Sequence, residues 1–304
     1  MDEASGVLRR RVFEEMFGAR QLSVLELLRA ISRYAQGQEY RFLDSEKFHS
    51  IVASDLMRGQ RIYWQELIAR SHFAATSSAI RHERWLDGCL GAVCDGNYLI
   101  FCSAFRGLLE SAADSFEGLF RAPQCFAENR KRIKDILEGK DTGKEIFISR
   151  EFEDSLIHFS HARKKIALEG GAPESHRAKQ VREYMRIFEV GQLPNVIECY
   201  SELCEVAHPS ALSVLAYVQS EKTSDTVIWR INADTDPEQI ASFIKRYNSL
   251  MQELMMFVLN PLLLTLYALE RLPSERPNCP EMANVDLSRI PAFRKFSGHL
   301  EDSE

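Results

Sequence analysis

One short segment, residues 200–210, combines side chains that could do chemistry; it reads YSELCEVAHPS. Tyr200, Cys204 and His208 are spaced four apart, so on a helix they share one face. A residue before proline is pushed out of the α region, so Pro209 predicts a helix that ends at His208. The partial negative charge of a helix C-terminus favours a protonated imidazole there. The segment therefore predicts a histidine positioned for proton transfer or for ion pairing.

A second pair of charged side chains lies in a strongly apolar segment. Arg106 and Glu110 are four residues apart within 98–120, so they share a helix face. A charge buried in such a helix needs a partner. The pair therefore predicts a polar contact with another helix.

The simplest arrangement packs the two segments together. Arg106 would then meet Glu205 or Glu202, and Glu110 would meet His208. In one interpretation this is a site for phosphodiester chemistry, because histidine moves protons near neutral pH and arginine holds phosphate. In the other it is a salt-bridge network that fixes helix register. A buried pair of this kind predicts that Arg106→Ala costs about 3–5 kcal/mol.

A group of histidines is the other candidate, for metal binding. His158 and His161 are three residues apart, with Glu153, Asp154 and His176 close in sequence. Metal proteins use such sets, but this spacing matches no strong zinc pattern. A surface helix is the preferred interpretation. Phosphate-loop, dinucleotide-binding and GxSxG motifs are absent from the sequence, so no metal or cofactor is predicted.

Bulk composition is typical of a globular protein. Of 304 residues, 45% are hydrophobic and 27% charged, and the formal net charge is −6. An acidic net charge argues against extensive nucleic-acid binding, because the surfaces that bind nucleic acid are mostly basic. A local basic groove, and thus RNA binding, stays open.

Cysteine usage and the N-terminus both suggest the cytoplasm. The seven cysteines form no CxxC pair, which is typical of buried thiols in a reducing compartment. The first residues lack the basic region and apolar stretch of an export signal. The apolar stretch 254–269 is shorter than the roughly 20 residues of a membrane span and contains Pro261. It predicts a buried, kinked core helix and no membrane span.

Helical periodicity covers most of the chain. Apolar residues recur at helical spacing over 7–36, with a break at Gly18, and then over 60–94 and 98–120. Asp44 or Ser45 is a suitable cap for the helix that follows it. The region 121–186 predicts shorter basic helices on the periphery of the bundle, with a loop at Gly170–Pro173 and a new helix from Glu174 or Ser175.

Only one region changes to an alternating pattern. Residues 214–231 alternate apolar and polar side chains around a polar loop, which predicts a β-hairpin. Asp236 and Pro237 then begin a helix that runs to about Arg271. The fold class is therefore all-α: a multi-helix bundle with one small β-hairpin insertion. We expect one helical-bundle domain over 1–272, and over 273–304 a proline-containing C-terminal arm or a partly disordered end.

The segment around His208 resembles a known group. Its motif is followed by a hairpin and a last apolar helix, as in bacterial all-helical proteins that are distantly similar to the HEPN superfamily. The residues that carry the motif are Tyr200, Leu203, Cys204, Glu205, His208 and Pro209. Arg106 and Glu110 resemble the Arg and Glu of those proteins' upstream helix. The resemblance covers 98–120 and 195–270 and implies a HEPN-like helical core that often dimerises.

Many HEPN proteins are metal-independent RNases of toxin–antitoxin, abortive-infection or CRISPR-linked defence systems. Their signature is an Arg and a His four to six residues apart, whereas here Glu202, Leu203 and Cys204 occupy the positions before His208. If Arg106 supplied the charge from a neighbouring helix, the chemistry could survive; otherwise this is a non-catalytic relative.

Two functions follow. The first is an interaction module of a bacterial defence or stress-response system, acting through self-association or a partner protein. The alternative is an endoribonuclease using His208 and Arg106, with Glu110, Glu205 and Tyr200 completing its catalytic site. A basic groove leading to His208 would favour the enzyme, and an exposed apolar patch would favour the module.

Overall fold

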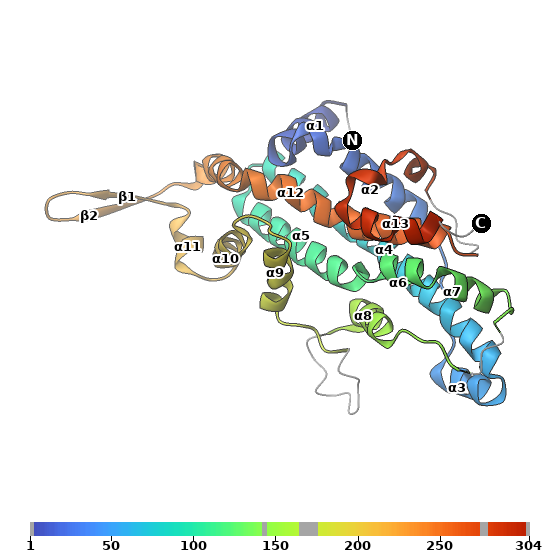
Figure 1. Cartoon of the computed structure of the whole chain (residues 1–304). Coiled ribbons are helices and arrows are strands. Elements are labelled where there is room, and N and C mark those ends of the chain that lie inside the picture. The colour runs from blue at the N-terminus through green and yellow to red at the C-terminus, as the bar shows by residue number, and fades with distance from the viewer. Residues whose placement is uncertain (1–2, 142–144, 164–175, 274–278, 302–304) are drawn as a thin grey trace. The chain divides into compact units, whose positions relative to one another are not determined.

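The computed structural model describes residues 3–141, 145–163, 176–273 and 279–301 (Figure 1). Helices account for most of these residues, and a single antiparallel hairpin is the only sheet among them. The predicted all-α fold with one small β-hairpin is confirmed.

The chain divides into two compact units. The first unit comprises residues 1–26, 81–113 and 181–257, and the second comprises 27–80, 114–180 and 258–304. Each unit is therefore assembled from segments far apart in sequence. The expectation of a single domain over 1–272 stays a prediction.

The first unit holds the residues singled out by the sequence. Its elements are α1 (Glu3–Phe17), η1 (Ala19–Gln21), the start of α2 (Leu22–Ala35), the C-terminal part of α4 (Leu56–Cys94), most of α5 (Tyr98–Leu119), α9 (Val181–Val190), α10 (Val196–Ala207), α11 (Ala211–Leu215), β1 (Val218–Lys222), β2 (Val227–Ile231), η3 (Ala233–Thr235) and the first part of α12 (Asp236–Glu270). Gly18 takes a φ of 86° between α1 and η1, a backbone conformation that suits glycine. The expected break in the N-terminal helix is therefore confirmed.

Aromatic packing fixes α5 within this unit. Phe101 and Phe105 of α5 each meet Phe243 of α12 edge-on, with ring centroids 5.4 and 6.1 Å apart. A Cβ on Gly107 would lie 2.7 Å from the Trp85 ring, so only glycine allows α4 and α5 to approach this closely. These contacts hold α5 in a fixed orientation, and with it the two charged side chains that it carries.

Helix α10 ends where the sequence predicts. His208 is its C-terminal cap, with φ −106° and ψ 160°, and its N–H donates to the Cys204 carbonyl. Leu203 and Cys199 are fully buried and anchor the helix in the core. The following Pro209 explains the extended conformation of His208.

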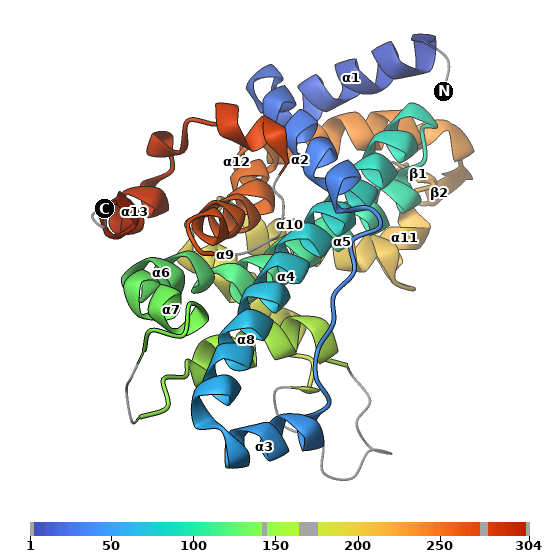
Figure 2. The same ribbon diagram turned by 90° about the vertical axis from the view of Figure 1, so that its right-hand side faces the viewer.

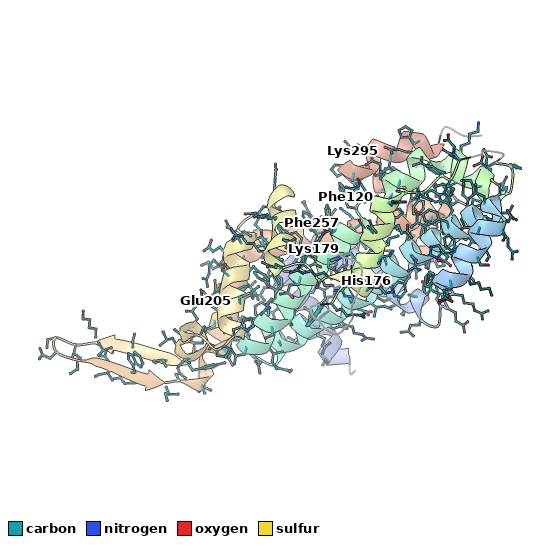
Figure 3. All side chains as sticks on the ribbon, turned by 90° about the horizontal axis from the view of Figure 1, so that it is seen from below. Phe120, His176, Lys179, Glu205, Phe257 and Lys295 are labelled. Atoms are coloured by element: carbon teal, nitrogen blue, oxygen red, sulfur yellow. The ribbon has the colours of Figure 1, made fainter. Side chains whose placement is uncertain are left out.

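The hairpin is shorter than predicted at its start. β1 and β2 pair antiparallel, from Val218 opposite Ile231 to Lys222 opposite Val227. Val214, expected in the first strand, belongs instead to α11. A reciprocal capping box between Ser210 and Ser213 starts that helix, so local capping overrides the alternating pattern. The hairpin extends away from the helices of its own unit (Figures 1 and 3).

The second unit contains the remaining parts of α2, α4, α5 and α12 and several short helices. Its further elements are α3 (Ser45–Ser54), α6 (Ala122–Glu128), α7 (Arg130–Leu137), α8 (Arg150–His161), η4 (Pro280–Asn284), η5 (Leu287–Arg289) and α13 (Pro291–Glu301). Asp44 caps α3 as predicted, because its carboxylate accepts the Glu46 N–H at 2.9 Å. The expected loop at Gly170–Pro173 and the expected helix start at Glu174 or Ser175 lie outside the described residues.

The C-terminal arm is more ordered than expected. Its described part folds into η4, η5 and α13, and α13 packs beside α6 (Figure 2). Phe296 is buried, and Phe293 meets the Tyr267 ring edge-on at 5.2 Å. Of the two alternatives predicted for this region, an arm or a partly disordered end, the disordered end is therefore wrong over 280–301. The aromatic pair three residues apart is the helical signal that indicated otherwise.

The long apolar helix α12 is a core helix, as predicted. Leu254, Met255 and Val258 are fully buried. Residues 233–270 form one helix that is long and apolar enough to cross a membrane, yet 67% of its most apolar window is buried within the protein. The backbone leaves helical geometry at Tyr247, with φ −109° and ψ 19°, and not at Pro261 as expected.

Candidate functional site on helices α5 and α10

Four of the predicted site residues meet at the junction of α5 and α10. Arg106 and Glu110 come from α5, Tyr200 comes from α10, and His208 is the cap of α10. We call these four side chains the polar cluster. The structure therefore brings together the two segments that the sequence suggested would pack.

Arginine and histidine are in direct contact. Arg106 Nη1 lies 2.7 Å from His208 Nε2. A guanidinium has no acceptor atom, so it donates and Nε2 accepts, which places the ring proton on Nδ1. This contact is that of a neutral imidazole. A protonated ring, expected from the helix end alone, would bring two cations together.

Glu110 is shared by two donors. It accepts from Arg106 Nε at 2.9 Å and from the Tyr200 hydroxyl at 2.5 Å, both through Oε1. Burial and the hydrogen bond to Glu110 raise the pKa of Tyr200 well above its usual value. Burial lowers the pKa of Arg106, but its hydrogen bond to Glu110 and the charge of Glu110 more than offset this effect. The guanidinium also lies 5.8 Å from the centroid of the Tyr200 ring.

The expected pairing of Arg106 with Glu205 or Glu202 is wrong. Glu202 accepts instead from Arg246 Nη1 at 3.0 Å and from the Tyr247 hydroxyl at 2.8 Å. Glu205 is exposed and takes no part in the cluster. The reason is rotation about α10: at 100° per residue, the face that turns Tyr200 and His208 toward α5 turns both glutamates elsewhere. The predicted contact of Glu110 with His208 is replaced by Arg106, which lies between them.

The cluster is open to solvent. The Arg106 and Glu110 side chains keep 22% and 34% of their exposure, and His208 is exposed. A phosphate could therefore reach the guanidinium and the imidazole. The arrangement can hold an anion and transfer a proton, which are the two elements of metal-free phosphodiester cleavage.

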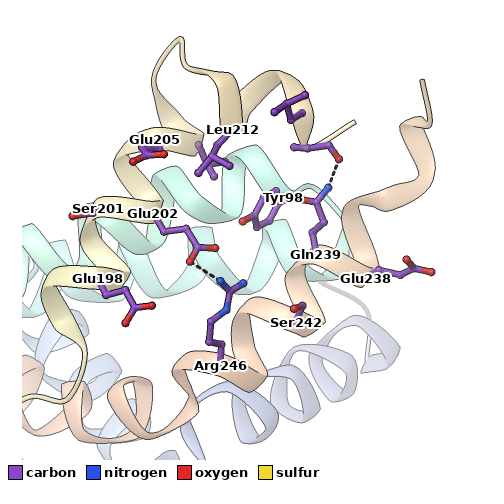
Figure 4. Close-up of a pocket in the computed structure, with 13 residues that line it drawn as sticks. Tyr98, Glu198, Ser201, Glu202, Glu205, Leu212, Glu238, Gln239, Ser242 and Arg246 are labelled. Carbon is purple, nitrogen blue, oxygen red and sulfur yellow. Dashed lines mark hydrogen bonds and ion pairs between the residues drawn. The ribbon is translucent and has the colours of Figure 1, made fainter. Parts of the chain in front are cut away.

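An acidic groove runs along the other side of α10, where it faces α11 and α12 (Figure 4). The groove has a volume of about 770 Å³ and four glutamates on its walls: Glu198, Glu202, Glu205 and Glu238. Arg246 is the one basic side chain of the described lining and is paired with Glu202. Sequence reasoning missed this groove, although the spacing of Glu198, Glu202 and Glu205 places them together on a helix. Its charge would repel a polyanion approaching this side of α10.

Apolar side chains form a second exposed surface, which we call the apolar arm: α11, β1 and β2. All five residues of β2 are exposed; Trp229 keeps 66% of its exposure and Ile231 keeps 87%. In α11, Leu212, Val214 and Leu215 are also exposed. The alternating sequence pattern predicts a hairpin but gives no sign that its apolar face is uncovered.

The histidine group shows no metal-binding geometry. The His161 and His176 rings stack at 5.3 Å, and burial together with nearby positive charges lowers the pKa of His161. Across the described ranges, no three or more His, Cys, Asp and Glu side chains converge as a metal would require. All seven cysteines are free thiols.

No family model matches the sequence, and comparisons with curated proteins and with solved structures give no match. The resemblance to the HEPN superfamily therefore rests on residues 98–120 and 195–270 alone. The polar cluster and the apolar arm are the two exposed features that bear on function.

Proposed function

We propose that this chain is a HEPN-like helical interaction module that acts through its apolar arm, by self-association or by binding a partner protein. The observation that carries the proposal is the full exposure of β2, with Trp229 and Ile231 uncovered. Contiguous exposed apolar surface on a soluble protein marks an interaction site.

The physical cost of leaving the arm bare supports this function. A lone two-stranded hairpin is marginally stable in water, and it becomes stable when its apolar face is covered or its sheet is extended. Tryptophan is also among the residues most enriched at the centres of protein interfaces. A protein surface that covers Trp229 and Ile231 would therefore stabilise the arm and gain affinity from the same contacts.

Electrostatics favour a protein over a nucleic acid as the partner. The net charge is −6, and the groove beside α10 carries four glutamates. Phosphate backbones bind to clusters of lysine and arginine, which this side of α10 does not offer. The resemblance to HEPN proteins supports a cytoplasmic bacterial defence or stress-response system as the setting.

Replacing the arm's apolar side chains tests the proposal. The variant carries Trp229→Ser and Ile231→Ser, and its control carries Ser224→Ala and Asp225→Asn in the exposed turn of the same hairpin. We expect wild type and control to self-associate in sedimentation experiments or to retain a stoichiometric protein from the source cells, and the serine variant to do neither. Equal behaviour of all three proteins would remove the arm from the function.

One observation supports a second function, a metal-independent endoribonuclease: the 2.7 Å contact between Arg106 and His208. Arg106 would hold the scissile phosphate and His208 would move the proton. Incubation with total RNA in the presence of a chelator tests it. His208→Ala should then reduce cleavage by about 10²–10⁴-fold. His299→Ala, at an exposed histidine of α13, is the matched control.

Two results would exclude an endoribonuclease that uses His208 and Arg106. If wild-type protein leaves RNA intact, the interaction module stands alone. Cleavage that persists in folded His208→Ala protein would assign the activity to other residues or to a contaminant.

A further inference from the structure

The hydrogen bonds of the hairpin reveal which backbone groups its strands leave open. Thr223 N–H donates to the Thr226 carbonyl at 2.8 Å, and Asn232 N–H donates to the Tyr217 carbonyl at 2.9 Å. In an antiparallel ladder, hydrogen-bonded pairs alternate with non-bonded pairs. With the observed register, Ile228 and Arg230 therefore direct their N–H and C=O groups toward β1.

The intervening residues of β2 point the other way. Val227, Trp229 and Ile231 direct their N–H and C=O groups to the outer edge of the sheet, and within the described part of the chain the sheet ends there. Edge strands are usually protected by charged side chains, proline or bulges. In β2 the single charge, Arg230, is neutralised by Glu221 at 2.6 Å, so the edge is unprotected.

We propose that the occupant of this edge is a second copy of the chain, whose β2 pairs antiparallel with the first around a twofold axis at Trp229. The inference rests on the proposed function and names its partner. Trp229 would pair with Trp229 of the second copy, and Val227 with Ile231. All three residues have their backbone groups directed outward, so each pair exchanges both hydrogen bonds.

Charge and shape agree with this register. Arg230 lies opposite Ile228 of the second copy, so the two arginines do not face each other. In the two transverse rows of the four-stranded sheet that contain an arginine, Arg230 of one copy lies on the same face as Glu221 of the other. The register thus places no like charges opposite one another, and it pairs apolar with apolar side chains at positions 227, 229 and 231.

The pairing also extends the two-stranded hairpin of each copy into a four-stranded sheet. Val218, Val227, Trp229 and Ile231 occupy one face of the hairpin in the observed register, and Ser220 and Lys222 of β1 share that face. Two copies would join the apolar side chains of β2 into one continuous strip at the centre of a four-stranded sheet, with the two tryptophans side by side. Three or more strands with an apolar face are stable where a lone hairpin is marginal.

Mixed cysteine variants test the register directly and keep Trp229 in place. Val227→Cys and Ile231→Cys proteins are oxidised separately and as a mixture, and the disulfides are identified by mass spectrometry. Opposed residues of a bonded pair lie about 5.5 Å apart at Cα, within disulfide reach. In the Val227→Cys protein alone, the two introduced thiols would be separated by four residue steps, about 14 Å, which is too far.

We expect efficient disulfides between positions 227 and 231 in the mixture, several-fold less cross-linking in either protein alone, and loss of the cross-link when Trp229→Lys is added to both. Wild-type protein carries the seven native cysteines and serves as the background control. An associating protein whose disulfides ignore this register would overturn edge pairing and leave the interaction module standing. A wild type that is monomeric at every concentration would overturn self-association, while arm-dependent capture of another protein would still support the module.

Discussion

The polar cluster and the apolar arm both belong to the first unit, and they differ in how completely the chain itself satisfies them. In the cluster, Arg106, Glu110, Tyr200 and His208 all have partners within hydrogen-bonding distance. In the arm, every residue of β2 is exposed, and its outer edge ends the sheet in the described chain. The polar groups of the cluster are paired within one molecule, whereas the apolar side chains of β2 are left exposed, and we propose that a second molecule covers them.

This difference separates stability from association. A hydrogen-bonded, partly buried network contributes to folding, because removing one member leaves another unpaired. Exposed apolar side chains contribute little to folding, because unfolding hardly changes their contact with water. Substitutions near the cluster should therefore lower the free energy of unfolding and leave association intact, whereas substitutions in the arm should weaken association and leave the free energy of unfolding nearly unchanged.

The largest contrast is expected between two aliphatic residues of the first unit. Leu203 is fully buried on α10, and Ile231 keeps 87% of its exposure. Leu203→Ala should lower the free energy of unfolding by about 2–5 kcal/mol, because it opens a cavity behind the helix that carries Tyr200 and His208. Ile231→Ala should change it by no more than about 0.5 kcal/mol. Urea unfolding of dilute protein measures both values.

The reverse ranking is expected for association. Ile231→Ala should weaken self-association in sedimentation equilibrium, and Leu203→Ala should retain it as long as the protein is folded. If Ile231→Ala unfolds the dilute monomer as readily as Leu203→Ala does, the arm is part of the folded core and the contrast fails.

The second effect concerns Arg106. Its position in an apolar helix predicts a cost of about 3–5 kcal/mol for alanine, the range for a buried ion pair. In the structure the side chain is partly exposed, so water replaces part of what is lost. We therefore expect Arg106→Ala to cost about 1–2 kcal/mol, measured by thermal or urea unfolding. Arg84→Ala, at an exposed arginine of α4, is the matched control and should be nearly neutral.

A loss of about 3–5 kcal/mol, as for a buried ion pair, would show that the cluster is more enclosed than its exposure indicates. An unchanged melting temperature would instead show that Arg106 contributes nothing to folding and is held for a ligand.

The backbone features of the site could be predicted from sequence because they depend on neighbouring residues. Pro209 forces the chain out of the helix at His208, and four-residue spacing places Arg106 beside Glu110. The hairpin follows from alternation, although the Ser210 capping box converts its predicted first residues into α11. Each of these signals acts within one turn or one strand.

The partners across helices could not be predicted, because they depend on how far α10 is rotated against α5. Spacing along the chain leaves Glu202, Glu205 and His208 as candidates for Arg106. The burial of Leu203 and Cys199 selects among them by fixing which side of α10 faces inward. The solvent exposure of the apolar arm could not be predicted either, because the alternating pattern of a strand is the same whether its apolar face is covered or exposed.

The smallest effect concerns the Tyr200 hydroxyl and its dependence on pH. Burial and the hydrogen bond to Glu110 raise the Tyr200 pKa in the folded protein above the ordinary value of about 10. The folded state thus retains the phenolic proton at a pH where the unfolded chain has lost it. By linkage, this contribution to stability is fully present below about pH 10 and is lost as the pH rises toward the folded pKa.

Tyr200→Phe should therefore cost about 0.5–1.5 kcal/mol near neutral pH, because one hydrogen bond to Glu110 is removed. Its free energy of unfolding should also fall less steeply than that of wild type above about pH 10. The decline will not vanish, because burial also raises the pKa values of Tyr63, Tyr98 and Tyr247. Urea unfolding across the alkaline range measures the difference, with Tyr34→Phe in α2 as the control at an exposed tyrosine. If the free energy of unfolding falls equally steeply with pH in Tyr200→Phe and in wild type, Glu110 does not raise the pKa of the Tyr200 hydroxyl. The cluster is then looser than its distances indicate.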